Sequence, residues 1–306
     1  NNIMNNINYP IKSDYSNLKT FVINLDDYKE NYNKQLPYLE NIGLKIERFS
    51  GINALKDEHL KPEYKEYISN FAFKFTPKSV IGCALSHILC CKYIYEKYIA
   101  CELNELLYGG NTPYFLIMED DAFPKYNKTE FYKQLNKTIC EITILDSNWE
   151  IIQLHSDFIY ETKETYNVHL VCGSTAGYLI SINGIKKTIN DKIYSHIDFF
   201  QHNFITYRKY RAKKNLFYTN EKESLNRNIM KTKNLSYYSL YLKAYILKSF
   251  NNYTNLFKLR GEKSYANYLE FKIIKLPYFK KEYTANELID YLLGLILTRK
   301  IINYIK

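Results

Sequence analysis

Residues 114–121 read Tyr-Phe-Leu-Ile-Met-Glu-Asp-Asp, and this stretch is the strongest indication of the fold class. Its first five residues form an apolar run without polar alternation, which is typical of a strand that is buried on both faces. The run ends directly in three carboxylates, Glu119, Asp120 and Asp121. Because ligands bind at the carboxyl ends of the strands in open α/β sheets, we expect a binding site at this position.

The three adjacent carboxylates have two interpretations. They repel one another, and a divalent cation relieves that repulsion most directly. Oxygen ligands suit Mg²⁺ or Mn²⁺, and such an ion can hold a diphosphate at the same time. A solvated acidic loop after a strand explains the same residues equally well. The triplet alone therefore leaves both interpretations open.

Strands and helices alternate on both sides of this stretch. Apolar runs predict strands over Thr20–Leu25, Trp149–Leu154 and Gly177–Ser181, and a further strand is expected over Lys45–Phe49. Apolar spacings of three and four predict helices over residues 31–43 and 79–100. Gly43 is expected to end the first helix, and a further helix is expected from Ile185. The succession of strand, helix and strand favours a parallel sheet with helices on its faces, so we predict an α/β domain.

The last quarter of the chain differs in composition. Residues 231–306 hold 14 Lys/Arg and 5 Asp/Glu, so most of the formal net charge of +10 lies there. We expect one domain over residues 15–235 and a basic, Tyr-rich helical extension over residues 236–306. The extension suits a solvated helix face, peripheral contact with a membrane, or self-association. It lacks a recognisable nucleic-acid motif, so a specific nucleic-acid partner is not expected.

The cysteines and the N-terminus bear on the cellular compartment. The six cysteines contain no CxxC pair and no zinc-ligand spacing, which favours free thiols in a reducing compartment. No run of about 18 apolar residues is present, so no transmembrane helix is expected. Residues 1–10 lack the features of a secretory signal. We therefore expect a cytoplasmic protein or a piece of a longer chain.

Several segments occur in an order that resembles glycosyltransferase family 25. They are Val22–Asp26 (VINLD), Arg48-Phe49, Ile81–His87 (IGCALSH), Leu116–Ala122 (LIMEDDA), Gly177–Ser181 (GYLIS) with Gly184, and Ile197–Phe199 (IDF). This family contains bacterial lipooligosaccharide galactosyltransferases and procollagen galactosyltransferases. The resemblance covers about residues 20–230, and the Gly-Cys-x-x-Ser-His and Glu-Asp-Asp strings are its most specific parts.

The resemblance implies a GT-A fold, which is a Rossmann-like α/β domain, and a metal-dependent hexosyltransferase. The donor would be a UDP-hexose, with galactose or glucose as the sugar, and the cofactor Mn²⁺ or Mg²⁺. The acceptor would be a hydroxyl group of a glycan or of a collagen-like protein, and transfer would invert the anomeric carbon.

Residue roles follow from the same resemblance. The nucleotide-sugar-binding residues would be Asn24, Leu25, Asp26, Ser86, His87, Glu119 and Asp120. Asp121 would be the first metal ligand, with Glu119 and a later histidine, His196 or His202. Asp198 would be the general base, because an inverting transfer needs a carboxylate that takes the proton of the acceptor hydroxyl.

The chain departs from the family pattern at two places. Asp27, Tyr28 and Asn31 stand in a stretch where many members carry arginines, and Asn53-Ala54 replaces an Asp-Gly pair. The first departure affects the expected contacts with the diphosphate or uracil, and the second affects the expected bend of its loop. The alternatives are a catalytically inactive family member, and a protein whose basic extension binds nucleic acid or a membrane surface.

Overall fold

The computed structural model describes residues 18–69, 72–73, 76–100, 114–156, 174–194, 197 and 207–220, together with two short strands nearer the C-terminus. The chain divides into two compact units, Asn1–Tyr245 and Ile246–Lys306. In the second unit, β9 (Lys272–Lys275) pairs antiparallel with β10 (Glu282–Thr284), a pairing that the sequence did not predict. The helices expected over residues 236–306 lie outside the described residues, and the boundary after residue 235 stays a prediction.

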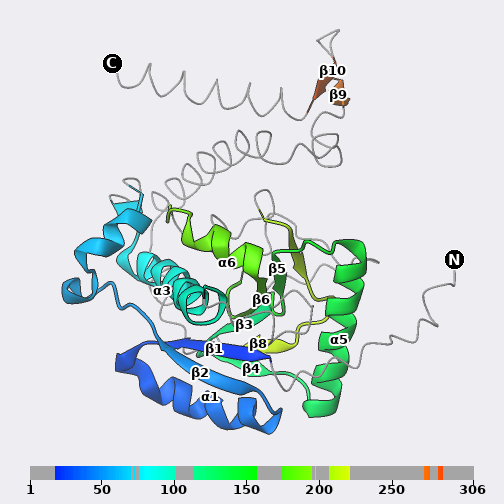
Figure 1. The fold of residues 1–306 in the computed structure, drawn as a ribbon, viewed down its shortest axis with the longest axis horizontal. Coiled ribbons are helices and arrows are strands. Elements are labelled where there is room, and N and C mark those ends of the chain that lie inside the picture. Colours follow the sequence, from blue (N-terminus) through cyan, green and yellow to red (C-terminus); the bar gives the residue numbers. More distant parts are fainter. Residues whose placement is uncertain are drawn as a thin grey trace, which may run out of the picture. The chain divides into compact units, whose positions relative to one another are not determined.

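A six-stranded sheet organises the first unit (Figure 1). Its order is β2 (Lys45–Ser50), β1 (Lys19–Asn24), β3 (Tyr114–Glu119), β6 (Gly177–Ser181), β5 (Ile151–Gln153) and β7 (Lys209–Arg211). Five strands run parallel, and β6 runs antiparallel to both of its neighbours. The predicted α/β class with a mostly parallel sheet is therefore confirmed, while the reversed direction of β6 is a feature that the sequence did not indicate.

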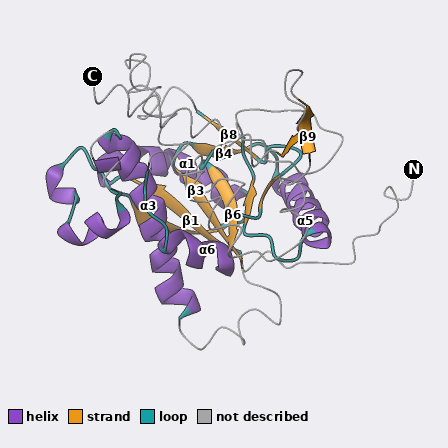
Figure 2. Cartoon of the chain, turned by 90° about the horizontal axis from the view of Figure 1, so that it is seen from above, coloured by secondary structure: helices purple, strands orange, loops and turns teal. Residues whose placement is uncertain are grey.

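Helices cover both faces of the sheet, and Figure 2 shows the same layers from above. On one face, α1 (Lys29–Asn41) and α5 (Lys128–Leu145) share a hydrophobic core with Leu116 and Met118 of β3. On the other face, α3 (Lys78–Ile94) and α6 (Ile182–Ile189) pack with Phe115 and Ile117. All four of these β3 side chains are buried, which confirms the prediction of a strand covered on both faces.

The helix ends follow from local sequence signals. Gly43 has a positive φ of 81°, a conformation that favours glycine, and it follows the end of α1 as predicted. The side chain of Asn127 accepts a hydrogen bond from the backbone N–H of Glu130 and so caps α5. The side chain of Ser181 caps α6 in the same way. The long predicted helix up to residue 100 is α3 followed by a π-helical turn, η6 (Tyr95–Ile99).

A second small sheet lies next to the acidic residues. There, β4 (Ala122–Pro124) pairs antiparallel with β8 (Phe217–Thr219). Three short 3₁₀ helices complete the described elements: η3 (Asp26–Tyr28), η4 (Asp57–His59) and η5 (Pro62–Tyr67). Across the described residues, none of the helices combines the length and the apolar character needed to cross a membrane.

Candidate functional site

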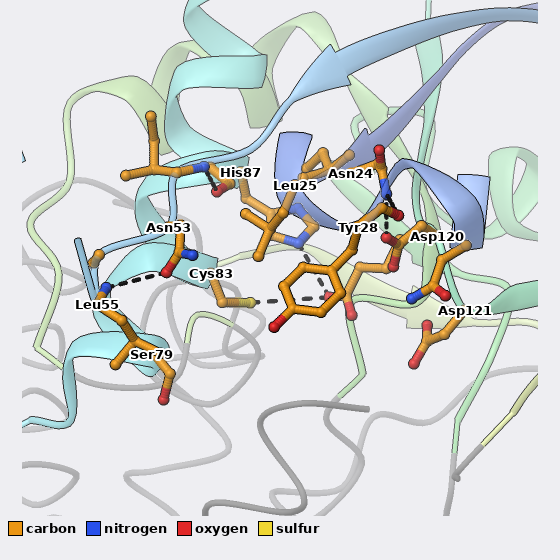
Figure 3. Close-up of a pocket in the computed structure, with 16 residues that line it drawn as sticks. Asn24, Leu25, Tyr28, Asn53, Leu55, Ser79, Cys83, His87, Asp120 and Asp121 are labelled. Carbon is orange, nitrogen blue, oxygen red and sulfur yellow. Dashed lines mark hydrogen bonds and ion pairs between the residues drawn. The ribbon is translucent and has the colours of Figure 1, made fainter. Parts of the chain in front are cut away.

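A pocket lies where β1 and β3 end, at the carboxyl edge of the sheet (Figure 3). Parallel pairing places Ile23 of β1 opposite Glu119 of β3, so the residues that follow both strands meet at this edge. The pocket is lined by seven of the residues predicted from the sequence: Asn24, Leu25, Ser86, His87, Glu119, Asp120 and Asp121. The three segments that carry them are far apart in the chain, and the fold brings them together.

Glu119 is held by polar groups from two elements. Its Oε1 lies 3.2 Å from Nε2 of His87 on α3 and accepts a hydrogen bond from the hydroxyl of Thr175, just before β6. Burial raises the pKa of the Glu119 carboxyl, but the hydrogen bond and charge of His87 and the Thr175 hydroxyl lower it further, so the net pKa lies below its usual value. Glu119 is therefore an ionised carboxylate at neutral pH.

His87 is fixed at both of its ring nitrogens. The residue is 1% exposed, and its Nδ1 lies 2.9 Å from the hydroxyl oxygen of Tyr178 on β6. Burial raises the pKa of Tyr178 well above its usual value, so the tyrosine keeps its proton and can exchange a hydrogen bond with the imidazole. The ring of His87 is thereby held with Nε2 directed at Glu119.

Asn24 and Arg48 orient the carboxylate of Asp120. The Asn24 side-chain amide donates hydrogen bonds to Asp120 Oδ2 and, at 2.8 Å, to the carbonyl oxygen of Tyr28. Its own Oδ1 accepts a hydrogen bond of 2.8 Å from Nε of Arg48. Because Asn24 is buried and bonded on both sides of its amide, Asp120 is presented to the pocket by a rigid support.

Asp26 does not line the pocket, although the sequence resemblance placed it with the nucleotide-binding residues. Its carboxylate oxygens accept hydrogen bonds of 2.7 Å from Nη2 of Arg48 and from the hydroxyl of Ser50. The hydrogen bond from Ser50 and then that from Arg48 hold the pKa of Asp26 below its usual value. In this structure Asp26 positions Arg48.

The Gly-Cys-x-x-Ser-His string joins α3 to the loop that follows β2. A Cβ atom on Gly82 would lie 2.6 Å from the carbonyl oxygen of Ile52, so only glycine allows this approach. The hydroxyl of Ser86 accepts a hydrogen bond of 2.8 Å from the Ile52 N–H and donates one of 2.7 Å to the carbonyl of Gly82. These contacts place Asn53 and Leu55 in the pocket wall.

A side chain of α1, Gln35, holds the backbone of the acidic triplet. Gln35 is completely buried, and its side-chain amide donates hydrogen bonds to the carbonyl oxygens of Glu119 and Ala122. Sequence reasoning missed Gln35, because a polar residue within an amphipathic helix gives no sign of its tertiary partner. Its two bonds bracket Asp120 and Asp121 and fix the turn that carries them.

Two sets of side chains at the pocket could hold a cation. Asp120 and Asp121 offer carboxylate oxygens, which fit Mg²⁺ or Mn²⁺. Among the described residues, Cys83, His87 and Glu119 form a second set whose ligand atoms all lie within 4.8 Å of one another. From the sequence, Cys83 was expected only as a free thiol. The remaining predicted residues, His196, Asp198 and His202, lie outside the described residues.

Comparison with known proteins gave two matches. The model of the family described as "Glycosyltransferase family 25 (LPS biosynthesis protein)" matches residues 17–200, which include β1, α3 and the acidic triplet. A protein from Aedes aegypti named "Glycosyltransferase 25 family member" is 27% identical to this chain over 186 residues. The match covers 56% of this chain and only 28% of that relative, so the chain spans a minor part of the relative's length.

Proposed function

Because this chain belongs to glycosyltransferase family 25, we propose that it transfers a hexose from a UDP-sugar to a hydroxyl group of a glycan or a collagen-like protein. The observation that carries the proposal is the convergence of Asn24, His87 and the acidic triplet in one pocket. The pocket lies at the carboxyl edge of a mostly parallel sheet, which is where open α/β folds bind nucleotides.

The charges of the pocket support a metal-dependent donor site. Among the described residues that line it, none is Lys or Arg, whereas three are carboxylates. A diphosphate would be repelled by this lining without a cation. We therefore assign Asp120 and Asp121 as the residues that would hold Mn²⁺ or Mg²⁺. When bound, the ion would neutralise the charge that develops on the departing UDP.

Neutral side chains that line the same pocket suit the nucleoside part of the donor. The aromatic ring of Tyr28 and the apolar side chain of Leu25 line the pocket and offer surfaces for a base. The side chains of Asn31 and Asn53 offer amide donors and acceptors for hydroxyl or carbonyl groups. Of these residues, Tyr28 and Asn31 stand in the stretch where many family members carry arginines.

The proposal retains Asp198 as the general base. An inverting transfer requires a carboxylate that accepts the acceptor's proton while the hydroxyl oxygen attacks the anomeric carbon. Glu119 is poorly suited to this role, because its lowered pKa makes it a weak base and its Oε1 already accepts hydrogen bonds. Glu119 acts instead as a positioning residue for His87 and the donor pocket.

Release of UDP from a panel of UDP-sugars, with Mn²⁺ or with a chelator, tests the proposal. One UDP-hexose should be hydrolysed slowly, and chelation should abolish the reaction. Asp121→Asn should lower the rate at least about 100-fold, since a lost metal ligand removes charge stabilisation in the transition state. Asp57→Asn is the matched control, because Asp57 is an exposed carboxylate that pairs with Lys78 and does not line the pocket.

Three results would contradict the proposal. UDP-sugars that bind without any hydrolysis or transfer would indicate a catalytically inactive family member. Full activity in the presence of the chelator would remove the metal from the mechanism. Equal loss of activity in Asp57→Asn and Asp121→Asn would show that the effect of the substitution is not specific to the pocket.

A further inference from the structure

We propose that Cys83, His87 and Glu119 form a Zn²⁺ site in the wall of the pocket. Cys83 and His87 are four residues apart on α3, so their side chains leave the same face of the helix one turn apart. Glu119 reaches the same point from the end of β3. The fold thus gathers a thiol, an imidazole and a carboxylate around one position, which is the ligand chemistry that zinc uses in proteins.

Two of the three distances between ligand atoms are near those of a formed site, and all three atoms lie within 4.8 Å of one another. Nε2 of His87 and Oε1 of Glu119 are 3.2 Å apart, and Sγ of Cys83 is 4.0 Å from the same oxygen. With zinc bonds of about 2.0–2.3 Å, tetrahedral ligands are separated by roughly 3.3–3.6 Å. A decrease of about half an ångström in the distance between Sγ of Cys83 and Oε1 of Glu119 would bring it into this range.

The Cys83 ligand makes this site chemically different from the one proposed for the donor cation. Thiolate ligands select Zn²⁺, whereas Mg²⁺ and Mn²⁺ prefer sites made of oxygen ligands, such as Asp120 and Asp121. Three protein ligands leave the fourth position of a tetrahedral zinc open. Cys83, His87 and Glu119 all line the pocket, so a ligand from solvent or substrate can reach that position.

The side chains of His87 and Glu119 already have the outer hydrogen-bond partners that orient ligands in metal sites. Nδ1 of His87 faces the Tyr178 hydroxyl, which can accept a hydrogen bond from Nδ1–H when Nε2 binds a metal. The hydroxyl of Thr175 donates to Glu119 and limits rotation of its carboxylate. Such outer contacts orient ligands, and their loss typically lowers metal affinity about 10- to 100-fold.

Binding requires only proton release. Zn²⁺ would take the place of the hydrogen bond between Nε2 of His87 and Oε1 of Glu119, and the proton displaced from that contact and the thiol proton of Cys83 would pass to solvent as the metal bonds form. No electron is transferred and no other reactant is needed. Because the site is inferred from the positions of these three ligand atoms, it does not depend on the proposed transferase activity. It predicts that Zn²⁺ inhibits donor binding, because Glu119 adjoins the carboxylates assigned to the donor cation.

Cobalt titration of the metal-free protein tests the site, because Co²⁺ replaces Zn²⁺ and gives an intense sulfur-to-metal absorption when a thiolate is a ligand. The wild type should take up one Co²⁺ per chain with this absorption, and Zn²⁺ should displace it. Cys83→Ser should abolish the absorption and lower Zn²⁺ affinity at least about 100-fold. Cys140→Ser, which removes a buried thiol on α5, is the matched control and should behave as the wild type.

Two further measurements use protein that retains Cys83. Tyr178→Phe should lower Zn²⁺ affinity about 10-fold through the loss of the contact with His87. In the wild type, Zn²⁺ should slow alkylation of Cys83, mapped by mass spectrometry, at least about 10-fold, whereas Mg²⁺ should not. The site is refuted by absence of the sulfur-to-metal absorption, by its persistence in Cys83→Ser, or by alkylation of Cys83 at an unchanged rate in Zn²⁺.

Discussion

Replacing Gly82 with alanine tests how closely α3 packs on the loop after β2. A Cβ atom at this position would lie 2.6 Å from the carbonyl oxygen of Ile52, 3.0 Å from the backbone nitrogen of Ala54 and 3.1 Å from its Cβ. The first distance is about 0.7 Å shorter than a close carbon–oxygen contact of ~3.3 Å. Two of the three contacts are with backbone atoms, so the clash can be relieved only by moving the loop away from the helix.

The sign of the stability change depends on two opposing effects. Alanine inside a helix is favoured over glycine by about 0.8–1.0 kcal/mol. Forcing an extra methyl group into a packed interior typically costs about 1–3 kcal/mol. We expect the packing cost to exceed the helix gain, with a net loss of about 1 kcal/mol in the free energy of unfolding. Since the displaced loop carries Asn53 and Leu55, UDP affinity should fall about tenfold.

Urea unfolding and calorimetric titration with UDP and Mn²⁺ measure these two effects. Ser86→Ala is the companion variant, because it removes the hydrogen bond to the Ile52 N–H without introducing a clash. Both substitutions release the same loop, so the double variant should lose less UDP affinity than the sum of the single losses. A Gly82→Ala protein that is more stable by the full helix gain and binds UDP normally would refute the close packing that underlies this reasoning.

Three other substitutions probe the supports of the site and of the sheet. Gln35→Met should cost about 1–3 kcal/mol in urea unfolding, because two buried carbonyl oxygens lose their donor, and should weaken Mn²⁺-dependent UDP binding in calorimetry. Asp26→Asn should lower UDP affinity much less than Asp120→Asn, because the Asp26 carboxylate is 53% exposed and outside the pocket; equal losses in a titration would place it in the donor site. Burial raises the pKa of the Asp146 carboxyl, but its hydrogen bonds with Arg208 and Tyr210 lower it further, so the folded pKa lies below the unfolded value of about 3.9. The ionised carboxylate therefore stabilises the fold above the unfolded pKa, and this contribution disappears as the pH falls through the lower folded pKa. Asp146→Asn should therefore lower the free energy of unfolding by about 2 kcal/mol near pH 7. When the pH is lowered below about 4, the melting temperature of this variant should fall less than that of the wild type; parallel curves of melting temperature against pH would contradict this.

The sequence predicted those elements whose burial pattern is regular. The unbroken apolar run of β3 and the periodicity of α3 are confirmed, because each element buries a continuous surface. The three-residue strands β4, β7 and β8 are too short to produce a periodic pattern and were not predicted. Helix α5 was also missed, although Phe131, Leu135, Ile139 and Ile142 are buried at helical spacing. A regular signal was present there, hidden among many polar and β-branched residues.

The sequence predicted many of the residues that line the pocket, but it did not predict the contacts that hold them in place. Motif order placed Asn24, His87 and Glu119 together, because strand ends and helix starts meet at one edge of an α/β sheet. The sequence could not show that Glu119 bonds to Thr175, that Gln35 holds the triplet or that Cys83 faces the imidazole, because these contacts join distant segments. The assignment of Asp26 to the donor site stays a prediction, since its carboxylate bonds to Arg48 and Ser50 and does not line the pocket.

The reversed direction of β6 determines which residues reach the edge of the sheet that carries the pocket. Because β5 and β3 end at the pocket edge and β6 begins there, the chain leaves β5 at Leu154 and returns at Ala176 beside Glu119. Insertions or deletions between these two points would leave the paired strands in register. Surface connections tolerate such length changes far better than paired strands do. The start of β6, with Thr175 just before it, thus supports Glu119 at an edge where a parallel strand would have ended.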